Sequence, residues 1–448
     1  MKETGNLRHS ALSDRSMPGP TVAPADLKLK LAWVYFVLVF VAYCFVILTA
    51  KLPPPIVDYP EWVYQGTLFH GSITGHSIPG YVLKSYPVPF STIIVGLGLL
   101  DTVFTWQFAG KLWLCLYFAL AGFSTWIFLR ALRVKSASLL VVLPAVVFLN
   151  TDFWWGRVEY QIGVCLVMIL IALTITGTRP IYLSLLLVAI YFTHMEALAC
   201  ACLFLALWAG YTRQWGKLWA ALPVILLSFW YAVARYSGGD RDGSSSPSSN
   251  YLYGSKAFLI FKANTYFKIF GYINSRASDG SSQSEAIFGK ICFVALLICA
   301  MCMGLLCMTI LIQAALVRYR SGQRYFGVMI VSLIVLSVFV PQIFLGSADP
   351  GSRLLTMASV VGLSLFDWRG KKAKAITVLA VVFCFANLWQ FYRIDNDPLM
   401  PGHAKDLPAA MLLFGHIDPW SRLDIYNKLE RGEMDWPIAT TAIYLPKK

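Results

Sequence analysis

A short polar stretch holds several side chains that could do chemistry. It runs from Pro53 to Pro87, in a protein of which only 13% of the residues are charged. Its ionisable side chains are Asp58, Glu61, His70, His76 and Lys84. Carboxylates and imidazoles transfer protons, and an ammonium group binds anions. Because three consecutive prolines and several glycines exclude one continuous helix, we expect an irregular, aromatic loop that presents these groups.

The composition of the whole chain places this loop next to a membrane. Of the 448 residues, 58% are hydrophobic, and the mean hydropathy is +0.63. A soluble protein would be about half apolar and about a quarter charged. Repeated apolar runs predict transmembrane helices of about 20 residues, and their continuity excludes a barrel. The sequence therefore predicts an all-α polytopic membrane protein of about eleven transmembrane helices, with interfacial helices in a long first exported loop.

The apolar runs divide the chain into three parts. Residues 1–30 are rich in Pro and Ser, and we expect them to be disordered in the cytoplasm. Residues 31–392 form the predicted transmembrane domain, with exported loops at 51–108 and 237–286, and residues 393–448 form an exported tail or small domain. The predicted spans are 31–50, 109–129, 137–151, 162–177, two within 181–211, 218–236, 287–312, 325–345, 354–366 and 375–392. Helices at the membrane surface are expected within 89–108 and, with three lysines, within 251–272.

The orientation depends on how residues 181–211 are divided. As one helix this run would be about 46 Å long, which exceeds a hydrocarbon core of about 30 Å. A break at His194 instead puts five basic clusters on the side of the N-terminus, as the positive-inside rule requires. The clusters are Arg130/Arg133/Lys135, Arg179, Arg213/Lys217, Arg318/Arg320/Arg324 and Arg369/Lys371/Lys372/Lys374. The net charge of +14 is explained by these clusters, which fix the orientation of the protein in the membrane. No nucleic-acid partner is therefore expected.

With this topology, polar groups from four separate loops fall on the exported side. The first loop contributes Asp58, Glu61, His70, His76 and Lys84, and the other three contribute Asp152, Arg157 and Glu159, then His194 and Glu196, then Asp349 and Arg353. Ionisable groups near a bilayer usually face a cavity or one another, so the set predicts a single site at the outer face. A simpler alternative remains open for each. Asp58 could cap a helix that begins at Pro60, and Arg353 could anchor a helix at the membrane surface.

The sequence implies no certain cofactor. It contains no P-loop, no dinucleotide-binding glycine pattern and no GxSxG motif. His70 and His76 lie six residues apart, but a zinc-type site would need a third ligand. A divalent metal therefore stays open as a cofactor, without a ligand set that the sequence can name.

Residues 31–210 contain several short motifs whose order along the chain can be compared with that of a known family. The sequence PPPIVDYPEW places an acid after prolines and before an aromatic residue in the first exported loop. Tyr86, Pro87 and Pro89 follow, then an apolar interfacial helix and a span ending in Leu129-Arg130. This set, with Glu159 nearest to a second acidic position, resembles the GT-C superfamily of integral-membrane glycosyltransferases. Because Tyr59 follows Asp58, the chain lacks the doubled acid of the lipid A aminoarabinose and protein mannosyltransferase branches. It is more similar to uncharacterised bacterial members.

The resemblance implies transfer of a sugar from a polyprenyl-phosphate donor to a lipid, glycan or protein acceptor. It implies a setting among the lipids of a bacterial inner membrane, in the synthesis of the cell envelope. Asp58 would be the base, with Glu159 as its partner or substitute. Arg353, then Lys84 and Arg157, would bind the leaving phosphate. Other expected substrate contacts are Tyr59, Glu61, Trp62, His194 and Glu196.

Two other classes of function stay open. A transporter or flippase for lipid-linked glycans would have charges at the middle of the bilayer and inverted repeats. We find no clear internal repeat, and the centres of the apolar runs are almost free of charge. A ligase or polymerase of lipid-linked glycans, or a scaffold of such a pathway, is the second alternative. A ligase would share the outer-face site and use a larger lipid-linked donor.

Overall fold

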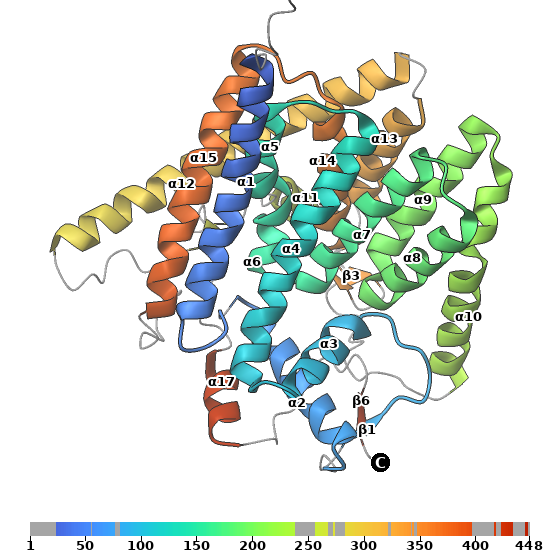
Figure 1. The fold of residues 1–448 in the computed structure, drawn as a ribbon, viewed down its shortest axis with the longest axis vertical. Helices are drawn as coiled ribbons and strands as arrows, with labels where there is room; N and C mark the ends of the chain where they lie inside the picture. Colours follow the sequence, from blue (N-terminus) through green and yellow to red (C-terminus); the bar gives the residue numbers. More distant parts are fainter. Residues whose placement is uncertain are drawn as a thin grey trace, which may run out of the picture.

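The computed structural model shows long, roughly parallel helices with shorter elements gathered at one end (Figure 1). It describes residues 24–54, 56–76, 81–237, 256–267, 272–273, 283–320, 324–341, 343–344, 347–396, 416–417, 423–432 and 444–446. The first elements are α1 (Pro24–Thr49), α2 (Tyr59–Ile73), β1 (Tyr81–Leu83), α3 (Ser91–Asp101), α4 (Trp106–Leu132), α5 (Ala137–Leu143), η1 (Pro144–Phe148), α6 (Thr151–Trp154), α7 (Val158–Ile175), α8 (Pro180–Thr193), α9 (Met195–Thr212), η2 (Trp215–Ala221) and α10 (Leu222–Ser237). The later ones are α11 (Lys256–Phe267), β2 (Tyr272–Ile273), α12 (Gln283–Arg320), α13 (Arg324–Phe339), β3 (Ile343–Phe344), β4 (Ser347–Ala348), α14 (Pro350–Leu365), α15 (Lys371–Asn396), β5 (His416–Ile417), α17 (Leu423–Glu430) and β6 (Tyr444–Pro446).

Eight helical stretches among the described residues are long and apolar enough to cross a membrane. They are Leu27–Thr49, Trp106–Leu132, Ala137–Trp154, Val158–Ile175, Met195–Thr212, Trp215–Ala234, Val294–Arg318 and Lys371–Trp389. The prediction of a polytopic helical membrane protein is thereby confirmed. Three further predicted spans form the shorter helices α8, α13 and α14, of 14, 16 and 16 residues. A helix of 14 residues is about 21 Å long, short of a hydrocarbon core of about 30 Å, so the count of about eleven stays a prediction.

The predicted break at His194 is present. Helix α8 ends at Thr193 and α9 begins at Met195, while His194 between them has an extended backbone with φ −163° and ψ 128°. The imidazole Nδ1 accepts a hydrogen bond from the Glu196 main-chain N–H at 3.3 Å, so His194 caps the second helix. The break therefore brings two ionisable side chains to the junction of two short helices.

Helix α14 is enclosed by its neighbours. All sixteen of its residues, Pro350–Leu365, are buried, and it packs against α9, α12, α13 and η1. Its sequence, PGSRLLTMASVVGLSL, is rich in small residues, which let helices approach one another closely inside a membrane bundle. The first turn of α14 therefore lies within the protein, where any polar side chain needs a protein partner.

The first loop forms a packed layer at one end of the bundle. Helices α2 and α3 cross so closely that a Cβ atom on Gly98 would lie 2.7 Å from the Gly66 carbonyl oxygen. The described parts of the C-terminal tail lie on this layer, because β6 pairs antiparallel with β1 and α17 packs against α2 (Figure 1). Trp106 and Tyr426 stack with ring centroids 5.7 Å apart. The first loop and these tail segments thus lie on the same side of the bundle.

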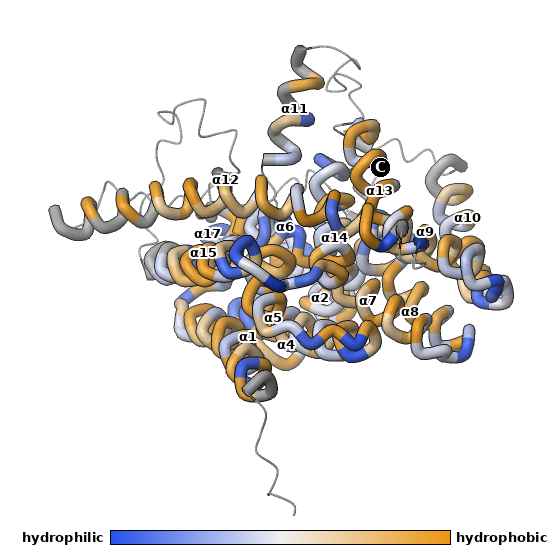
Figure 2. The backbone as a smooth tube through the Cα atoms, turned by 90° about the horizontal axis from the view of Figure 1, so that it is seen from above, coloured by the Kyte–Doolittle hydropathy of each residue, from blue (hydrophilic) through white to orange (hydrophobic). Residues whose placement is uncertain are grey.

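Basic residues gather at the opposite end. Arg130 and Arg133 of α4 and Arg318 of α12 line one hollow there, and the Lys217 ammonium donates to the Thr178 carbonyl. Figure 1 shows that α1 and α15 both begin at this end, and Figure 2 shows hydrophilic turns between largely hydrophobic helices. This arrangement agrees with the charge asymmetry that fixes orientation, and it makes the basic end the expected cytoplasmic one.

The predicted surface helix of 251–272 is present in part, as α11. The expectation that Lys262 contacts lipid headgroups is wrong, because its side chain is buried and only 5% exposed. Its ammonium donates to the carbonyl oxygens of Ser337, at 2.7 Å, and Val340. These carbonyls belong to the C-terminal end of α13, where the helix dipole favours a cation. Lys262 therefore ties α11 to α13 instead of to the bilayer.

The orientation can be measured with reporter fusions. We expect fusions after Arg213 and after Arg324 both to report the cytoplasm, because both positions lie at the basic end. A fusion after Thr105, beside the first loop, should report the exported side and serves as the control. An exported signal at Arg213 or Arg324 would contradict the assignment of α8 and α9 as separate crossings.

Candidate functional site

Ionisable side chains from three separate segments meet beneath the first loop. They come from the α6–α7 region, from the α8–α9 break and from the first turn of α14. Those that are at most 8% exposed are Asp152, Arg157, Glu159, His194 and Arg353, and Glu196 is slightly more open. Charged groups are almost never buried unless they are paired, so each of these side chains requires a partner within the protein.

Arg353 forms an ion pair with Glu196. The Arg353 Nη1 atom lies 2.6 Å from the Glu196 Oε2 atom, and both belong to helix first turns on different elements. The same carboxylate oxygen lies 3.1 Å from the His194 Nδ1 atom. The Arg353 guanidinium also lies over the Tyr160 ring, 5.8 Å from its centroid, and the Tyr160 hydroxyl donates to the Arg353 carbonyl. Arg353 is thus held by α7, α9 and its own helix, and it is not an exposed anchor at the membrane surface.

A second ion pair lies beside the first. The Arg157 Nη1 atom is 3.0 Å from the Asp152 Oδ1 atom, and it donates to the Ser352 hydroxyl at 3.4 Å. Asp152 also accepts from Thr356, whose hydroxyl lies 2.9 Å from its Oδ2 atom. Asn150 extends this network by donating to the Thr356 hydroxyl at 3.2 Å. The first turns of α14 therefore contact both ion pairs.

Glu159 is a further buried acid of this region, in the first turn of α7. Its side chain is only 4% exposed, and its Oε2 atom has no hydrogen-bond partner among the residues that the structure describes. Arg353, Arg157 and Asp58 all act on it electrostatically. A buried carboxyl with an open oxygen is costly to leave without a partner, so this atom is available to a ligand or to a proton.

Asp58 reaches the cluster from the first loop. It occupies the N-cap position of α2, followed by Pro60, but its side chain makes no capping hydrogen bond. Its main-chain N–H donates instead to the Trp155 carbonyl at 3.1 Å. The half-buried carboxylate is therefore not used to cap the helix, which was the simpler interpretation of this residue.

The turn after α6 is fitted closely against Asp58. Gly156 has φ +75°, and a Cβ atom there would lie 2.5 Å from the Tyr59 nitrogen and 2.7 Å from the Asp58 nitrogen. A side chain at this position would push the first loop away from the turn that carries Arg157. The distance between Asp58 and the buried cluster therefore depends on Gly156.

Replacing this glycine should loosen the site. We expect Gly156→Ala to destabilise the protein by about 2–5 kcal/mol, because about 1–2 kcal/mol of backbone strain adds to about 1–3 kcal/mol of steric clash. Gly177→Ala is the matched control, since Gly177 also has a positive φ, of +84°, but nothing lies within 4 Å of its added Cβ atom. Gly177→Ala should destabilise the protein by the backbone strain alone, about 1–2 kcal/mol. If both variants lowered the unfolding temperature in detergent by the same amount, the close contact of Gly156 with Asp58 and Tyr59 would be contradicted.

The His194 ring is enclosed by aromatic neighbours. Its centroid lies 4.7 Å from the Phe90 ring and 5.2 Å from the Tyr160 ring, both with edge-to-face geometry. Burial lowers the pKa of His194 from 6.5 to about 3, while Glu196 opposes this shift and Arg353 adds to it. The imidazole is therefore neutral near pH 7, and the charge of Glu196 is balanced by Arg353.

This burial makes stability depend on pH. The unfolded chain would take up a proton on His194 below about pH 6.5, whereas the folded protein would not until about pH 3. Stability should therefore fall as the pH drops through this window, by at most about 1.4 kcal/mol per pH unit from this one group. We expect His194→Gln to reduce the difference in unfolding midpoint between about pH 7 and about pH 5. The same pH dependence in both proteins would contradict this role.

The remaining predicted substrate contacts are placed differently. Tyr59 is fully buried and its hydroxyl donates to the Gly110 carbonyl at 2.5 Å, so it belongs to the core and does not present a face to a sugar. Trp62 packs partly buried against the core, and Glu61 lies in the first turn of α2. Trp155 is half-buried, with the Arg157 guanidinium 5.6 Å from its ring centroid. Lys84 follows β1 and is partly exposed, so its role stays a prediction.

Several polar members of the cluster were not selected from the sequence. They are Asn150, Gln161, Ser352 and Thr356. Asp152 was expected at the outer face from its position between two predicted spans, but no role in substrate binding or catalysis was predicted for it. Across the described part of the chain, no three His, Cys, Asp or Glu side chains are grouped as a metal site would require. His70 and His76 therefore lack a third ligand among those residues.

A function for this chain can be argued from its fold and from this cluster of side chains. No protein-family model, curated protein or solved structure matches the chain. The structure defines the class as a multi-pass helical membrane protein with buried ion pairs near one end.

Proposed function

We propose that the chain is a glycosyltransferase of GT-C type that uses a polyprenyl-phosphate-linked sugar at the outer face of a bacterial inner membrane. The observation that carries this proposal is the meeting of Asp58 and Glu159 with two buried arginines. Acids and arginines are the groups needed when a hydroxyl loses a proton while a phosphate leaves. The acceptor is a lipid, a glycan or a protein.

The proposed reaction assigns one task to each group. Asp58 removes the proton from the acceptor hydroxyl, and the oxygen then attacks the anomeric carbon of the donor sugar. The bond between that carbon and the lipid phosphate breaks, and the phosphate leaves with the electron pair. Arg353 and Arg157 stabilise the charge that develops on the phosphate oxygens. Glu159 assists Asp58 or replaces it as the proton acceptor.

Burial of the arginines supports this assignment. Each guanidinium is already oriented by a carboxylate, Arg353 by Glu196 and Arg157 by Asp152, so little reorganisation would accompany the reaction. Both side chains are buried, and electrostatic interactions are stronger there than in water. An entirely exposed cluster would offer neither advantage.

Turnover with purified protein tests the proposal. We expect donor consumption with polyprenyl-phosphate hexoses or pentoses and envelope lipid or glycan acceptors. Asp58→Asn should lower turnover by about 10²–10⁴-fold, because a carboxamide cannot accept the proton. Arg353→Lys should also lower turnover, since an ammonium group lacks the planar fork that binds phosphate oxygens.

Asp101→Asn is the control for general damage to the first loop, because Asp101 ends α3 outside the cluster. It should retain turnover. Activity that survives Asp58→Asn would show that Asp58 is not the base. If no form consumes donor but the protein moves lipid-linked glycan across proteoliposomes, a flippase is favoured. Transfer of a preassembled glycan, and not of a single sugar, would favour a ligase or polymerase.

A further inference from the structure

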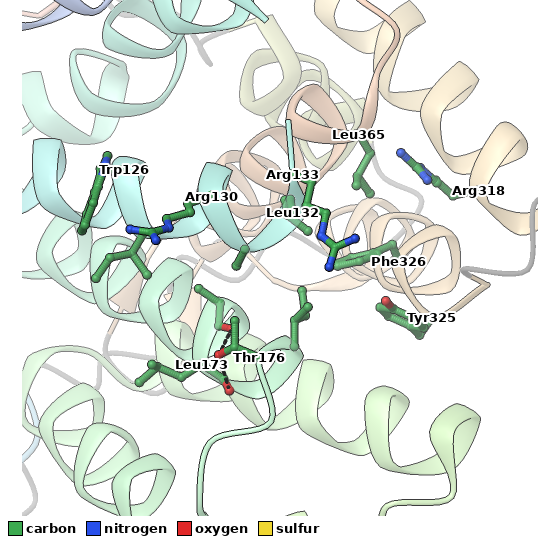
Figure 3. Close-up of a pocket in the computed structure, with 14 residues that line it drawn as sticks. Trp126, Arg130, Leu132, Arg133, Leu173, Thr176, Arg318, Tyr325, Phe326 and Leu365 are labelled. Carbon is green, nitrogen blue, oxygen red and sulfur yellow. Dashed lines mark hydrogen bonds between the residues drawn. The ribbon is translucent and has the colours of Figure 1, made fainter. Parts of the chain in front are cut away.

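A pocket of about 840 Å³ opens at the basic end of the bundle, far from the ion pairs (Figure 3). It lies where α4, α7 and α14 end, beside the facing ends of α12 and α13. Glu159 and Thr176 lie near opposite ends of α7, so 17 residues, or about 26 Å of helix, separate the two places. The pocket is therefore distinct from the candidate functional site.

The charged residues that line this pocket are all basic. Arg130 and Arg133 reach it from the end of α4, and Arg318 reaches it from α12 (Figure 3). None of the fourteen residues that line it is Asp or Glu. Figure 3 shows Arg130 beside Trp126, while Arg133 and Arg318 lie at the other side of the pocket. Three arginines along one pocket, with no acid among the lining residues, favour a phosphate or another anion, which they can bind through charge-assisted hydrogen bonds.

Arginines near helix C-termini often serve only to satisfy the last carbonyl groups. Here the main chain already does so. At the end of α4, the N–H groups of Arg133 and Val134 donate to the carbonyls of Arg130 and Leu129, at 3.2 and 3.0 Å. At the end of α7, the N–H groups of Thr176 and Thr178 close the helix in the same way. The arginines are thus not required as caps for these two helices.

The end of α14 is closed in the same manner. The Leu363 carbonyl accepts from the Trp368 indole N–H at 2.7 Å and from the Phe366 main-chain N–H at 3.4 Å. At each of the three helix ends that meet at the pocket, at least one of the last carbonyl groups, which would otherwise repel an anion, already accepts a hydrogen bond.

Part of the pocket wall is apolar. Ile127, Leu173 and Phe326 are among the lining residues, as is Trp126, which is 47% exposed. The Arg130 guanidinium lies 5.5 Å from the Trp126 ring centroid. A tryptophan beside an arginine is typical of the membrane–water interface, so the pocket opens at the depth of lipid headgroups.

We propose that this pocket binds the phosphate headgroup of an anionic membrane phospholipid. The guanidinium groups of Arg133 and Arg318 would contact the phosphate, Arg130 would add positive charge at the edge marked by Trp126, and an acyl chain would leave along the surface there. The Thr176 hydroxyl, which donates to the Ala172 carbonyl at 3.0 Å, adds an oxygen to the wall that can accept from a headgroup hydroxyl. A zwitterionic lipid would bring a cation to the arginines and bind less well.

Native mass spectrometry of the full chain in detergent tests the proposal. Phosphatidylglycerol should bind at least about tenfold more tightly than phosphatidylcholine of the same chain length. The double variant Arg130→Gln/Arg133→Gln should lose about tenfold or more of this affinity, and adding Arg318→Gln should remove the preference. Arg179→Gln is the matched control: Arg179 is an exposed arginine at the N-terminus of α8, outside the pocket, and its loss should leave binding unchanged.

Further measurements distinguish a lipid phosphate from a soluble phosphate, and they exclude misfolding of the variants. Arg130→Lys/Arg133→Lys keeps the charge, so it should retain most of the preference, and each variant is compared only as a monodisperse species. Inorganic phosphate at millimolar concentration should neither raise the unfolding midpoint nor displace phosphatidylglycerol. If it does both through the same arginines, a soluble phosphate compound is the ligand and the lipid assignment is overturned. Equal binding of the two lipids, or a preference that survives the triple variant, also overturns it.

Discussion

A guanidinium group enclosed in an apolar bundle is the constraint on which the rest of this structure depends. Arg353 is only 5% exposed, and without a counter-charge it would cost about 3–5 kcal/mol. Glu196 supplies the charge, and it can do so because His194 ends α8 and lets α9 begin one residue later. The helix break and the ion pair therefore depend on each other. A continuous helix through this region would carry Glu196 on a regular turn without the capping contact from His194.

Helix α14 explains why the two ion pairs lie together. Ser352 and Thr356 are four residues apart and therefore on one face of the helix, and both contact Asp152. Arg353, one position along, points to Glu196 instead. One buried first turn thus joins α9 to the α6–α7 region. The π-helical segment η1 ends just before Asn150, and such segments often occur at functional places in helices.

Hydropathy and length were sufficient to predict the helical membrane class and the positions of most long helices. The break at His194 was predictable because the run around it is too long for one crossing. The partners of Asp152 were not predictable, since Ser352 and Thr356 lie 200 and 204 positions away and carry no distinguishing signal in an apolar run. Lys262 was misassigned for a related reason: the spacing of lysines on a helix cannot distinguish a lipid phosphate from the carbonyl end of another helix.

The buried charges themselves argue for a function at this place. A buried ion pair is weak evidence for stability, because apolar residues of similar volume often stabilise as well or better. This bundle nevertheless keeps two such pairs, Arg353 with Glu196 and Arg157 with Asp152, and both arginines act electrostatically on the buried Glu159. Packing alone does not require that arrangement. An anionic group and a hydroxyl that loses a proton would use the arginines and the acids together, and the proposed sugar transfer brings these two groups from its two substrates.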